Sequence, residues 1–302
     1  MRREADSLTA VRIDLHTHSN RSDGTDTPAE LVRRAAALGL DVVALTDHDS
    51  AKGWSEAHTA AQATGIRFVP GVEISCRHAG ASVHLLGYLL DPTHPPLAAE
   101  LHAVLAGRNT RLPAMIDRLQ ALDVGVDLDD VRRVAGPAAA LGRPHVADAL
   151  VDLGLVASRE EAFDRYLSPG QPAYVDRYAA DLDSMIQLVG SAGGVSVLAH
   201  PWARQSRAVL TPAALAELAA AGLCGVEVDH QDHDPSTRSE LGELADDLGL
   251  VRTGSSDYHG TGKVDHELGC NTTAPDQLAR LLDSAAAAAR SSGRTVPALA
   301  QG

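Results

Sequence analysis

Short apolar runs recur along the chain and alternate with longer segments in which the apolar residues have helical spacing. The runs predict seven strands, at residues 11–16, 42–48, 67–75, 82–90, 194–200, 225–230 and 251–257. The longer segments predict helices at 27–40, 211–222, 236–250 and 275–290. Strands that alternate with helices in this way are typical of an α/β fold with a mostly parallel sheet.

The predicted helix at 27–40 carries its own start signal. Thr27 is suited to the N-cap and Pro28 to the first helical position. Glu30 occupies the third position, where its carboxylate can accept a hydrogen bond from the backbone N–H of the cap residue. The local sequence therefore predicts the residue at which this helix begins.

The alternation of strands and helices stops between residues 97 and 178. The pattern there predicts helices alone, at 97–122, 127–135, 143–154 and 158–167. We expect a helical insertion domain at 97–178, placed between the fourth and fifth strands of a domain formed by 1–96 and 179–302. Its cationic side chains between 99 and 175 are all arginines, and Arg108, Arg111 and Arg143 are candidates to face a site.

Composition excludes several classes of protein. The 302 residues include 26 Lys and Arg against 40 Asp and Glu, which gives a net charge of −14. Proteins that bind long duplex nucleic acid usually carry an excess of basic residues, so this composition argues against that class. No run of about 20 apolar residues could cross a bilayer, and the start MRREADSLTA lacks the apolar core of a signal peptide. The three cysteines are widely separated and form no CxxC pair. We expect a cytoplasmic protein without a membrane partner, of unknown oligomeric state.

Side chains that bind metal ions gather at the ends of the predicted strands. The residues at or just beyond strand ends are His16, His18, His48, Glu73, His200, Asp257 and His259. Asp23 follows the first strand in a polar loop, and His84 lies within the fourth strand. Because the carboxyl ends of parallel strands lie on one face of an α/β fold, we expect most of these groups to meet.

The residue types indicate which ions fit. Imidazole together with carboxylate suits Zn²⁺, Mn²⁺ and Fe²⁺. In the His-x-His sequence of residues 16–18 both side chains point to one face of the strand, about 7 Å apart at their Cα atoms, and can hold one ion. Nine candidate ligands exceed the needs of one ion, so we expect two or three, with Glu73 as the natural bridge. Each motif alone has a structural explanation, such as a strand end at His200 or a turn at Asp257, but the coincidence of such residues at several strand ends favours metal ions.

In their order, these motifs resemble the PHP (polymerase and histidinol phosphatase) family of metal-dependent phosphoesterases. The matching segments are DLHTHSNRSDG, ALTDHD, PGVEIS, HLLGY, LAHP and TGSSDYHG, which span residues 14–260. The resemblance implies a distorted (β/α)₇ barrel with a di- or trinuclear centre that holds Mn²⁺, or alternatively Fe²⁺ or Zn²⁺. It groups the ligands into a first set (His16, His18, Glu73, Asp257), a second set (Asp23, His48, His259) and a third set (Glu73, His84, His200).

The insertion resembles that of free-standing family members that act on nucleotides, through GRPHVADALVDLG, EEAFDRYL and PAYVDRY. This implies hydrolysis of the 3′-phosphate of nucleoside 3′,5′-bisphosphates, and also of short 5′-phosphorylated RNA, by attack of a metal-bridging hydroxide on phosphorus. The expected partner is therefore a small phosphorylated nucleotide or a short RNA. Arg143 and Lys263 are candidates to contact phosphate, and His233 is a candidate to protonate the leaving group; for each cation a surface salt bridge is the alternative.

Other functions remain open at this stage. A phosphatase of the histidinol-phosphate type would use the same ligands, although the insertion matches that branch poorly. A metal-dependent amidohydrolase would also use a related barrel, typically with a carboxylated lysine as the bridge, and no lysine lies at the predicted strand ends. A non-catalytic sensing or scaffold domain should have lost ligands, and none is missing.

Overall fold

A computed structural model describes residues 11–138, 141–203 and 206–297. The charged start, on which the expectation of no signal peptide rests, lies outside these residues. Seven strands follow one another in the order β1-β2-β3-β4-β6-β7-β8, and β5 pairs with β3 off this path. The strands are β1 (Ile13–Asp14), β2 (Val42–Leu45), β3 (Arg67–His78), β4 (Ala81–Tyr88), β5 (Ala180–Asp181), β6 (Val195–Ala199), β7 (Gly225–Asp229) and β8 (Val251–Gly254).

The sheet curves until its two ends nearly meet. Thr17, just beyond β1, forms a parallel bridge with Tyr258, just beyond β8. The backbone N–H of His18 donates to the Tyr258 carbonyl oxygen at 2.8 Å, which connects the first and last strands across the gap. The predicted distorted seven-stranded barrel is thereby confirmed, with a short eighth strand that the sequence did not indicate.

One strand runs against the others. β4 pairs antiparallel with β3 on one side and with β6 on the other, whereas all the remaining pairs are parallel. A tight turn at Ala79 and Gly80, both with positive φ, joins β3 directly to β4. Because β4 is reversed, its first residues lie at the edge where its neighbours end, and His84 pairs in register with Ser75 of β3 and Ala199 of β6.

Six helices accompany the barrel strands. They are α1 (Pro28–Ala37), α2 (Trp54–Thr64), α7 (Leu182–Ser191), α8 (Pro212–Ala220), α9 (Pro235–Asp247) and α10 (Pro275–Ser292). The predicted cap of α1 is present, since Thr27 and Glu30 exchange hydrogen bonds in a capping box. The sequence pattern missed α2 and α7, because α2 is rich in alanine and polar residues and α7 follows β5 without a spacer. None of the helices within the described residues is long and apolar enough for a bilayer crossing.

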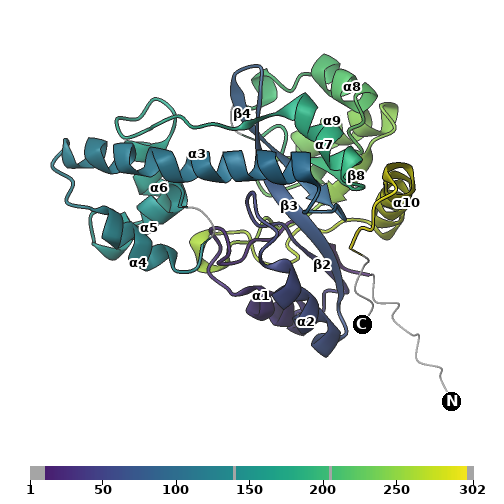
Figure 1. Cartoon of the computed structure of the whole chain (residues 1–302), viewed down its shortest axis with the longest axis horizontal. Coiled ribbons are helices and arrows are strands. Elements are labelled where there is room, and N and C mark those ends of the chain that lie inside the picture. Colours follow the sequence, from purple (N-terminus) through teal and green to yellow (C-terminus); the bar gives the residue numbers. More distant parts are fainter. Residues whose placement is uncertain (1–10, 139–140, 204–205, 298–302) are drawn as a thin grey trace.

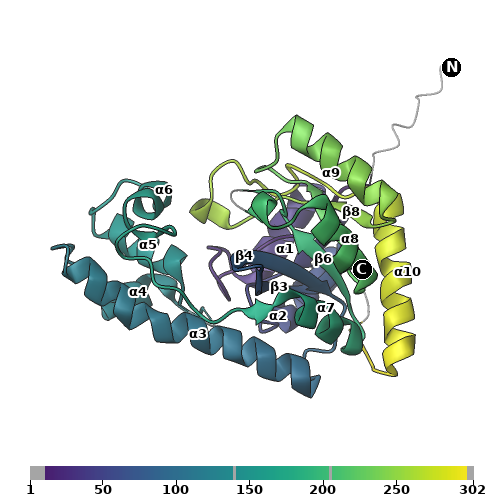
Figure 2. The ribbon, with the colours of Figure 1, turned by 90° about the horizontal axis from the view of Figure 1, so that it is seen from above.

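The predicted insertion is helical, and Figure 2 shows it beside the barrel. It contains α3 (Pro95–Gln120), α4 (Leu128–Ala135), α5 (Arg143–Asp152), α6 (Arg159–Ala162) and a π-helical turn at Phe163–Leu167. The long helix α3 reaches both parts of the molecule (Figure 1). Its first half packs Leu97 and Val104 into the core around β3, β4 and α7, whereas its second half places Met115 and Leu119 in a separate core with residues of α4 and α5. A domain boundary at residue 97 stays a prediction, and α3 contributes to the hydrophobic cores on both sides of it.

Candidate metal centre

The nine predicted ligands come together at one edge of the barrel. They arrive from the end of β1, the loop that follows it, the end of β2, the middle of β3, the start of β4, and the segments after β6 and β8. The sequence pattern ended the third strand at residue 75, but β3 continues to His78, so Glu73 lies inside it. Pairing with β2 stops at Pro70, and from there β3 continues beside β4. Glu73 therefore projects where β3 leaves β2, next to His48, with which it forms a parallel bridge.

The first group surrounds one point with two imidazoles and two carboxylates. The Nε2 atoms of His16 and His18 lie 3.0 Å apart. Glu73 Oε2 lies 3.4 Å from His16 Nε2 and 3.2 Å from His18 Nε2. Asp257 Oδ1 lies 3.4 Å from both of these nitrogens. Two ring nitrogens and two carboxylate oxygens that share so small a space form a suitable set of donors for a cation.

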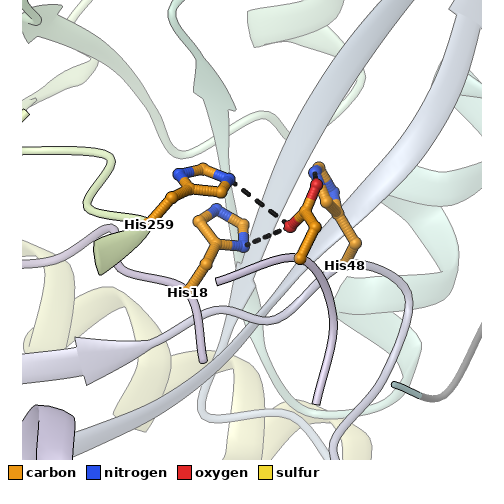
Figure 3. Close-up of side chains that lie close together, drawn as sticks. His18, His48 and His259 are labelled. Atoms are coloured by element: carbon orange, nitrogen blue, oxygen red, sulfur yellow. Dashed lines mark ion pairs between the residues drawn. The ribbon is translucent and has the colours of Figure 1, made fainter. Parts of the chain in front are cut away.

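The second group is built on Asp23. His48 Nε2 lies 3.6 Å from Asp23 Oδ2, and His259 Nε2 lies 3.4 Å from Asp23 Oδ1. His18 belongs here as well, with Nδ1 3.9 Å from Asp23 Oδ1. Figure 3 shows His18, His48 and His259 facing a common centre. His18 thus lies between the first and second groups, one nitrogen directed to each.

The third group uses the other oxygen of Glu73. Glu73 Oε1 lies 2.8 Å from His84 Nδ1 and 3.1 Å from His200 Nε2. His48 Nδ1 approaches Glu73 Oε2 at 3.0 Å and connects this group to the second. One carboxylate therefore contacts five imidazoles, which is the arrangement expected of a bridging ligand.

Unsatisfied polar atoms show that these residues fit metal ions. Asp23 Oδ1, His48 Nδ1 and His84 Nδ1 are buried and lie close to groups of opposite charge, yet none of these contacts within the described residues has the geometry of a hydrogen bond. Leaving a buried polar atom without a partner costs about 1–3 kcal/mol, so such atoms are rare without a reason. All three belong to the predicted ligand set. Divalent ions bound by these groups would satisfy each of them.

Electrostatics favour cations at this position. Burial raises the pKa of the Glu73 carboxyl, but His84, His48 and His16 outweigh burial and hold that pKa well below its usual range. Burial lowers the pKa of His18, yet hydrogen bonds that its ring donates to Asp257 and Glu73 raise it to about 9. Burial lowers the pKa of His48 to about 3, which leaves this ring neutral and able to donate a lone pair. The carboxylates thus stay ionised and attract positive charge, whether a proton or a metal ion.

Two candidate ligands have a strained backbone. His200 has φ 30° and Asp257 has φ 52°, both in the left-handed region that residues with a Cβ rarely adopt. Such strain costs on the order of 1–3 kcal/mol and tends to collect at functional sites. Here it turns both side chains back toward the group around Glu73.

A second layer of acidic residues, which the sequence analysis did not select, holds the candidate ligands. Glu227, fully buried in β7, accepts a hydrogen bond from His16 Nδ1 at 3.2 Å and another from the His200 backbone N–H at 2.8 Å. Asp47 accepts hydrogen bonds from Ser19 and Ser22 in the loop that carries Asp23. The signal for Glu227 was present, because GVEV at 225–228 repeats the pattern of GVEI at 71–74.

Asp257 has partners of its own. His230 Nε2 lies 3.3 Å from Asp257 Oδ2, and the Lys263 ammonium lies 2.5 Å from the same oxygen. His230, Asp257 and His266 form a further group with the spacing of metal ligands. However, His266 Nδ1 faces the Ser256 carbonyl oxygen at 2.7 Å, and His230 Nδ1 accepts from the Asp232 N–H at 3.0 Å. These bonds indicate that both rings serve to orient the Asp257 segment.

The three predicted catalytic residues have different surroundings. Lys263 lies at the centre through its ion pair with Asp257. Arg143 lies on α5, where it stacks between the rings of Phe163 and Tyr174 and donates to the Leu167 carbonyl oxygen. His233 is buried, with Nδ1 2.9 Å from the Val228 carbonyl oxygen and Nε2 accepting from the Trp202 N–H. Because both ring nitrogens of His233 are engaged with backbone, its role as a proton donor gains no support and stays a prediction.

Some histidines lie outside the candidate groups. His94 is buried, with its Nε2 3.1 Å from the Ser191 hydroxyl. His102 is exposed and His58 is half-exposed.

Known proteins resemble this chain over most of its length. A family model described as the PHP domain matches residues 14–136. The 3′,5′-nucleoside bisphosphate phosphatase of Chromobacterium violaceum is 36% identical over 259 residues, which cover 86% of this chain and 91% of that protein. The 5′-3′ exoribonuclease of Haemophilus influenzae is 34% identical and covers 82% of this chain and 90% of that protein.

Solved structures agree with the sequence similarities. A structure from Bifidobacterium adolescentis, named a metal-dependent phosphoesterase, superposes with a TM-score of 0.87 at 35% identity and covers 91% of this chain and 96% of that one. A structure from Chromobacterium violaceum, named an amidohydrolase and containing bound sulfate, gives a TM-score of 0.81 at 35% identity and covers 89% of this chain and 97% of that one.

Proposed function

Because the chain belongs to the PHP family of metal-dependent phosphoesterases, we propose that it removes the 3′-phosphate from nucleoside 3′,5′-bisphosphates. The chain is a phosphoric ester hydrolase, and the proposal concerns its substrate, its metal ions and the residues that act. A relative named for this activity is 36% identical across 91% of its own length. Short 5′-phosphorylated RNA is proposed as a further substrate, since other relatives are named 5′-3′ exoribonucleases.

The observation that carries the proposal is the convergence on Glu73. Its Oε2 contacts His16, His18 and His48, and its Oε1 contacts His84 and His200. We assign His16, His18, Glu73 and Asp257 to the first ion, Asp23, His48 and His259 to the second, and Glu73, His84 and His200 to the third. The mixture of imidazole and carboxylate donors, without cysteine, suits Mn²⁺.

When bound, divalent ions at this site lower the pKa of water toward neutrality and neutralise the charge that develops on a phosphate. The chain's own residues supply the geometry. Glu227 fixes the His16 ring through its Nδ1–H, so that Nε2 points into the centre. Asp47 and its serine partners hold the loop that presents Asp23.

The insertion completes the site from the opposite side. A small pocket beside His48 and Asp23 is also lined by Arg108 of α3 and His145 of α5. His145 Nε2 donates to the Ser22 carbonyl oxygen at 2.9 Å, which connects α5 to the loop that carries Asp23. The pocket therefore combines the metal-binding face with a guanidinium, and guanidinium groups bind phosphate well.

A second candidate function is hydrolysis of a C–N bond. The Chromobacterium violaceum structure named an amidohydrolase favours it, at 35% identity. Against it, the bridging position is taken by the Glu73 carboxylate, whereas a carboxylated lysine is typical of that chemistry. The same assay separates the two, because only an amidohydrolase would release amine from amide substrates.

The test is a turnover panel with Mn²⁺. Its substrates are a nucleoside 3′,5′-bisphosphate, a nucleoside monophosphate, histidinol phosphate, a short 5′-phosphorylated RNA and an amide. We expect the highest kcat/KM on the bisphosphate. Equal and feeble rates on all substrates would contradict the nucleotide assignment. Elemental analysis of the purified protein measures the number and identity of the ions independently of turnover.

A pair of histidine variants tests the site. His48→Ala should reduce turnover at least about 100-fold while the protein stays folded, because it removes a ligand and not a core side chain. His58→Ala is the matched control, since His58 is half-exposed on α2 and outside every candidate group. If the metals served only to stabilise the fold, His48→Ala would lower the melting temperature and leave turnover unchanged.

A further inference from the structure

Two loops carry most of the ligands proposed for the second ion. Asp23 lies on the segment between β1 and α1, residues 15–27, which we call the β1 loop. His259 lies on the segment between β8 and α10, residues 255–274, which we call the β8 loop. The loops contact each other, since the Thr25 N–H donates to the His259 carbonyl oxygen at 3.2 Å. The relative position of the two loops therefore determines whether both ligands reach one ion.

Arg159 reaches both loops from the insertion, where it is the first residue of α6. Its Nη1 donates to the Gly262 carbonyl oxygen at 2.9 Å, and its Nη2 makes a longer bond of 3.4 Å to the Asp23 carbonyl oxygen. The Gly262 N–H in turn donates to the His259 carbonyl oxygen at 3.3 Å. One side chain of the insertion thus holds the backbone of one proposed ligand and the turn that follows another.

Asp148 of α5 fixes the direction of the Arg159 side chain. Both of its carboxylate oxygens accept hydrogen bonds from the guanidinium, Oδ1 from Nε and Oδ2 from Nη2, the latter at 2.6 Å. A bidentate pair of this kind sets the plane of the guanidinium. The Arg159 side chain is 18% exposed, and Asp148 compensates its charge. Because its donors are directed at protein groups, the geometry indicates that Arg159 holds backbone and does not bind an anion.

The absence of a side chain at Gly262 makes this contact possible. A Cβ at position 262 would lie 2.7 Å from Arg159 Cζ and 2.8 Å from Arg159 Nη2, closer than non-bonded atoms approach. The φ angle of Gly262 is not in the left-handed region, so the close approach is the reason for glycine here. A methyl group at this position would displace the guanidinium while leaving Arg159 and Asp148 in the chain.

A second contact from the insertion supports the β1 loop. His145 Nδ1 accepts a hydrogen bond from the Gly142 N–H at 3.0 Å, so the ring proton lies on Nε2. This Nε2–H donates to the Ser22 carbonyl oxygen at 2.9 Å. His145 contacts the β1 loop, whereas Arg159 joins the β1 loop to the β8 loop.

We propose that Arg159 is a positioning residue, through which the insertion sets the affinity of the second metal position. This inference rests on the proposed assignment of Asp23, His48 and His259 to one ion. Arg159 acts on the backbone of the loops, since its bonds to them end on carbonyl oxygens. Ligands that are already held at the right separation bind an ion without a further cost of ordering the loops.

The first test measures Mn²⁺ binding directly, by calorimetric titration of metal-free protein. In Arg159→Met the affinity of one site should fall about 10-fold, because the support of its ligands is lost, and the other sites should stay within about twofold of the wild type. Arg132→Met on α4 is the matched control and should bind like the wild type, since Arg132 is exposed and paired with Asp129. Unchanged affinities in Arg159→Met, or an equal fall at every site, would overturn the proposal.

Gly262→Ala tests the same contact from the other side. It should weaken the same Mn²⁺ site by a similar factor. The double variant with Arg159→Met should bind no more weakly than either single variant, because both changes remove one contact. Gly125→Ala is the matched control, since a Cβ there meets open space. Additive losses in the double variant would count against the proposal.

His48→Ala identifies which site is affected, because it removes a proposed ligand of the second ion. When Arg159→Met is added to His48→Ala, the affinities of the remaining sites should not fall further. A further fall would show that Arg159 supports the centre as a whole, and the assignment to the second position would be wrong.

Turnover separates positioning from folding. At low Mn²⁺ the kcat of Arg159→Met should lie below that of the wild type, and a higher concentration of Mn²⁺ should restore it, because mass action fills the weakened site. A loss of kcat that Mn²⁺ does not restore would assign Arg159 to the fold and overturn the proposal. So would a lower melting temperature of the metal-free variant with unchanged Mn²⁺ affinities. If Arg159→Met does not fold, Gly262→Ala is measured in its place, and failure of both to fold would likewise assign the contact to the fold.

The Mn²⁺ titration is independent of the proposed substrate. A wild type that hydrolyses no nucleoside bisphosphate, together with a weakened site in Arg159→Met and Gly262→Ala, would contradict the proposed function and support the role of Arg159. A wild type that hydrolyses the bisphosphate, with variants that bind Mn²⁺ unchanged, would leave the function in place and overturn this inference.

Discussion

Glu73 shows how one side chain can organise a site of several ions. Each of its two oxygens faces a different set of imidazoles, and its ionised state is maintained by those imidazoles despite complete burial. A carboxylate has two oxygens and can bridge, whereas each imidazole nitrogen has a single lone pair. The placement of a carboxylate at this position, among histidines, is therefore a chemical requirement for a shared centre.

At the residue scale, Glu227 is predicted to position His16. Burial raises the pKa of the Glu227 carboxyl, but His16 and His230 outweigh burial and lower it to about 2, so the group is an anion that accepts from His16 Nδ1. Glu227→Gln preserves the shape and removes the charge. We expect the affinity for Mn²⁺ to fall roughly 10- to 100-fold, as measured by competition with a chelator.

Exposed Glu217 on α8 provides the control for this change. Glu217→Gln should bind Mn²⁺ like the wild type. An unchanged Mn²⁺ affinity in Glu227→Gln would show that the carboxylate serves the fold alone.

Asp14 gives a prediction of pH dependence at the same scale. Burial raises its pKa from 3.8 to about 6, although hydrogen bonds from Ser256 and Gly269 oppose the shift. The folded state therefore holds a proton that the unfolded state releases between pH 4 and 6, so stability from this group is present at low pH and lost as pH rises through about 6. The unfolding free energy lost through the ionisation of Asp14 is about 3 kcal/mol in total.

Urea unfolding of metal-free protein at pH 4, 5, 6 and 7 measures this effect. As the pH rises over this interval, the wild type should lose about 3 kcal/mol of unfolding free energy relative to Asp14→Asn. A difference that stays constant with pH would mean that Asp14 is already ionised at pH 4.

At the scale of single elements, the direction of β4 decides the composition of the site. In a fully parallel barrel the start of this strand would lie at the opposite edge from the ligands. The β3–β4 hairpin reverses it, and His84 then faces Glu73 at 2.8 Å. His84 can therefore lie near the start of its strand, whereas His200 lies just beyond the end of the neighbouring β6.

The capping box of α1 allows a prediction at the element scale. Thr27 accepts from the Glu30 N–H, and Glu30 accepts from the Thr27 N–H. Thr27→Ala removes one of these bonds and should cost about 1 kcal/mol of unfolding free energy, which lowers the melting temperature by roughly 2 °C in a chain of this size. Turnover should be unchanged, because the variant leaves the site intact.

Thr59 in the interior of α2 serves as the comparison. Its hydroxyl donates to the Ser55 carbonyl oxygen within the helix and caps nothing. Thr59→Ala should therefore be neutral or slightly stabilising, since alanine has the higher helix propensity. Equal losses of stability in both variants would contradict a specific role of the cap.

At the scale of the whole molecule, the barrel and its metal ions are expected to stabilise one another. The ligands come from strands spread along the sequence from His16 to His259, so bound ions would connect both ends of the sheet. Removal of the ions with a chelator should abolish turnover and lower the melting temperature. An ion present at 100 times its dissociation constant contributes about 2.7 kcal/mol of stability.

Calorimetry of the same preparation with and without chelator checks this expectation. Added Mn²⁺ should restore both turnover and the melting temperature. Full activity and unchanged melting after exhaustive chelation would contradict a role for metal ions.

The sequence by itself determined which residues form the elements and which chemistry the site can perform. Hydrophobic periodicity is a local property, so it predicted the seven main strands, the start of α1 at Thr27 and the helical character of the insertion. The types of side chain at the strand ends likewise indicated metal ions. The family resemblance then supplied a reaction class, which the comparisons with known proteins confirm.

Only the tertiary structure decided which groups meet. The reversal of β4, the continuation of β3 past Glu73 and the approach of Arg108 to His48 depend on contacts between segments far apart in the chain. Glu227 and Asp14 were missed because their roles consist of hydrogen bonds to residues more than 200 positions away.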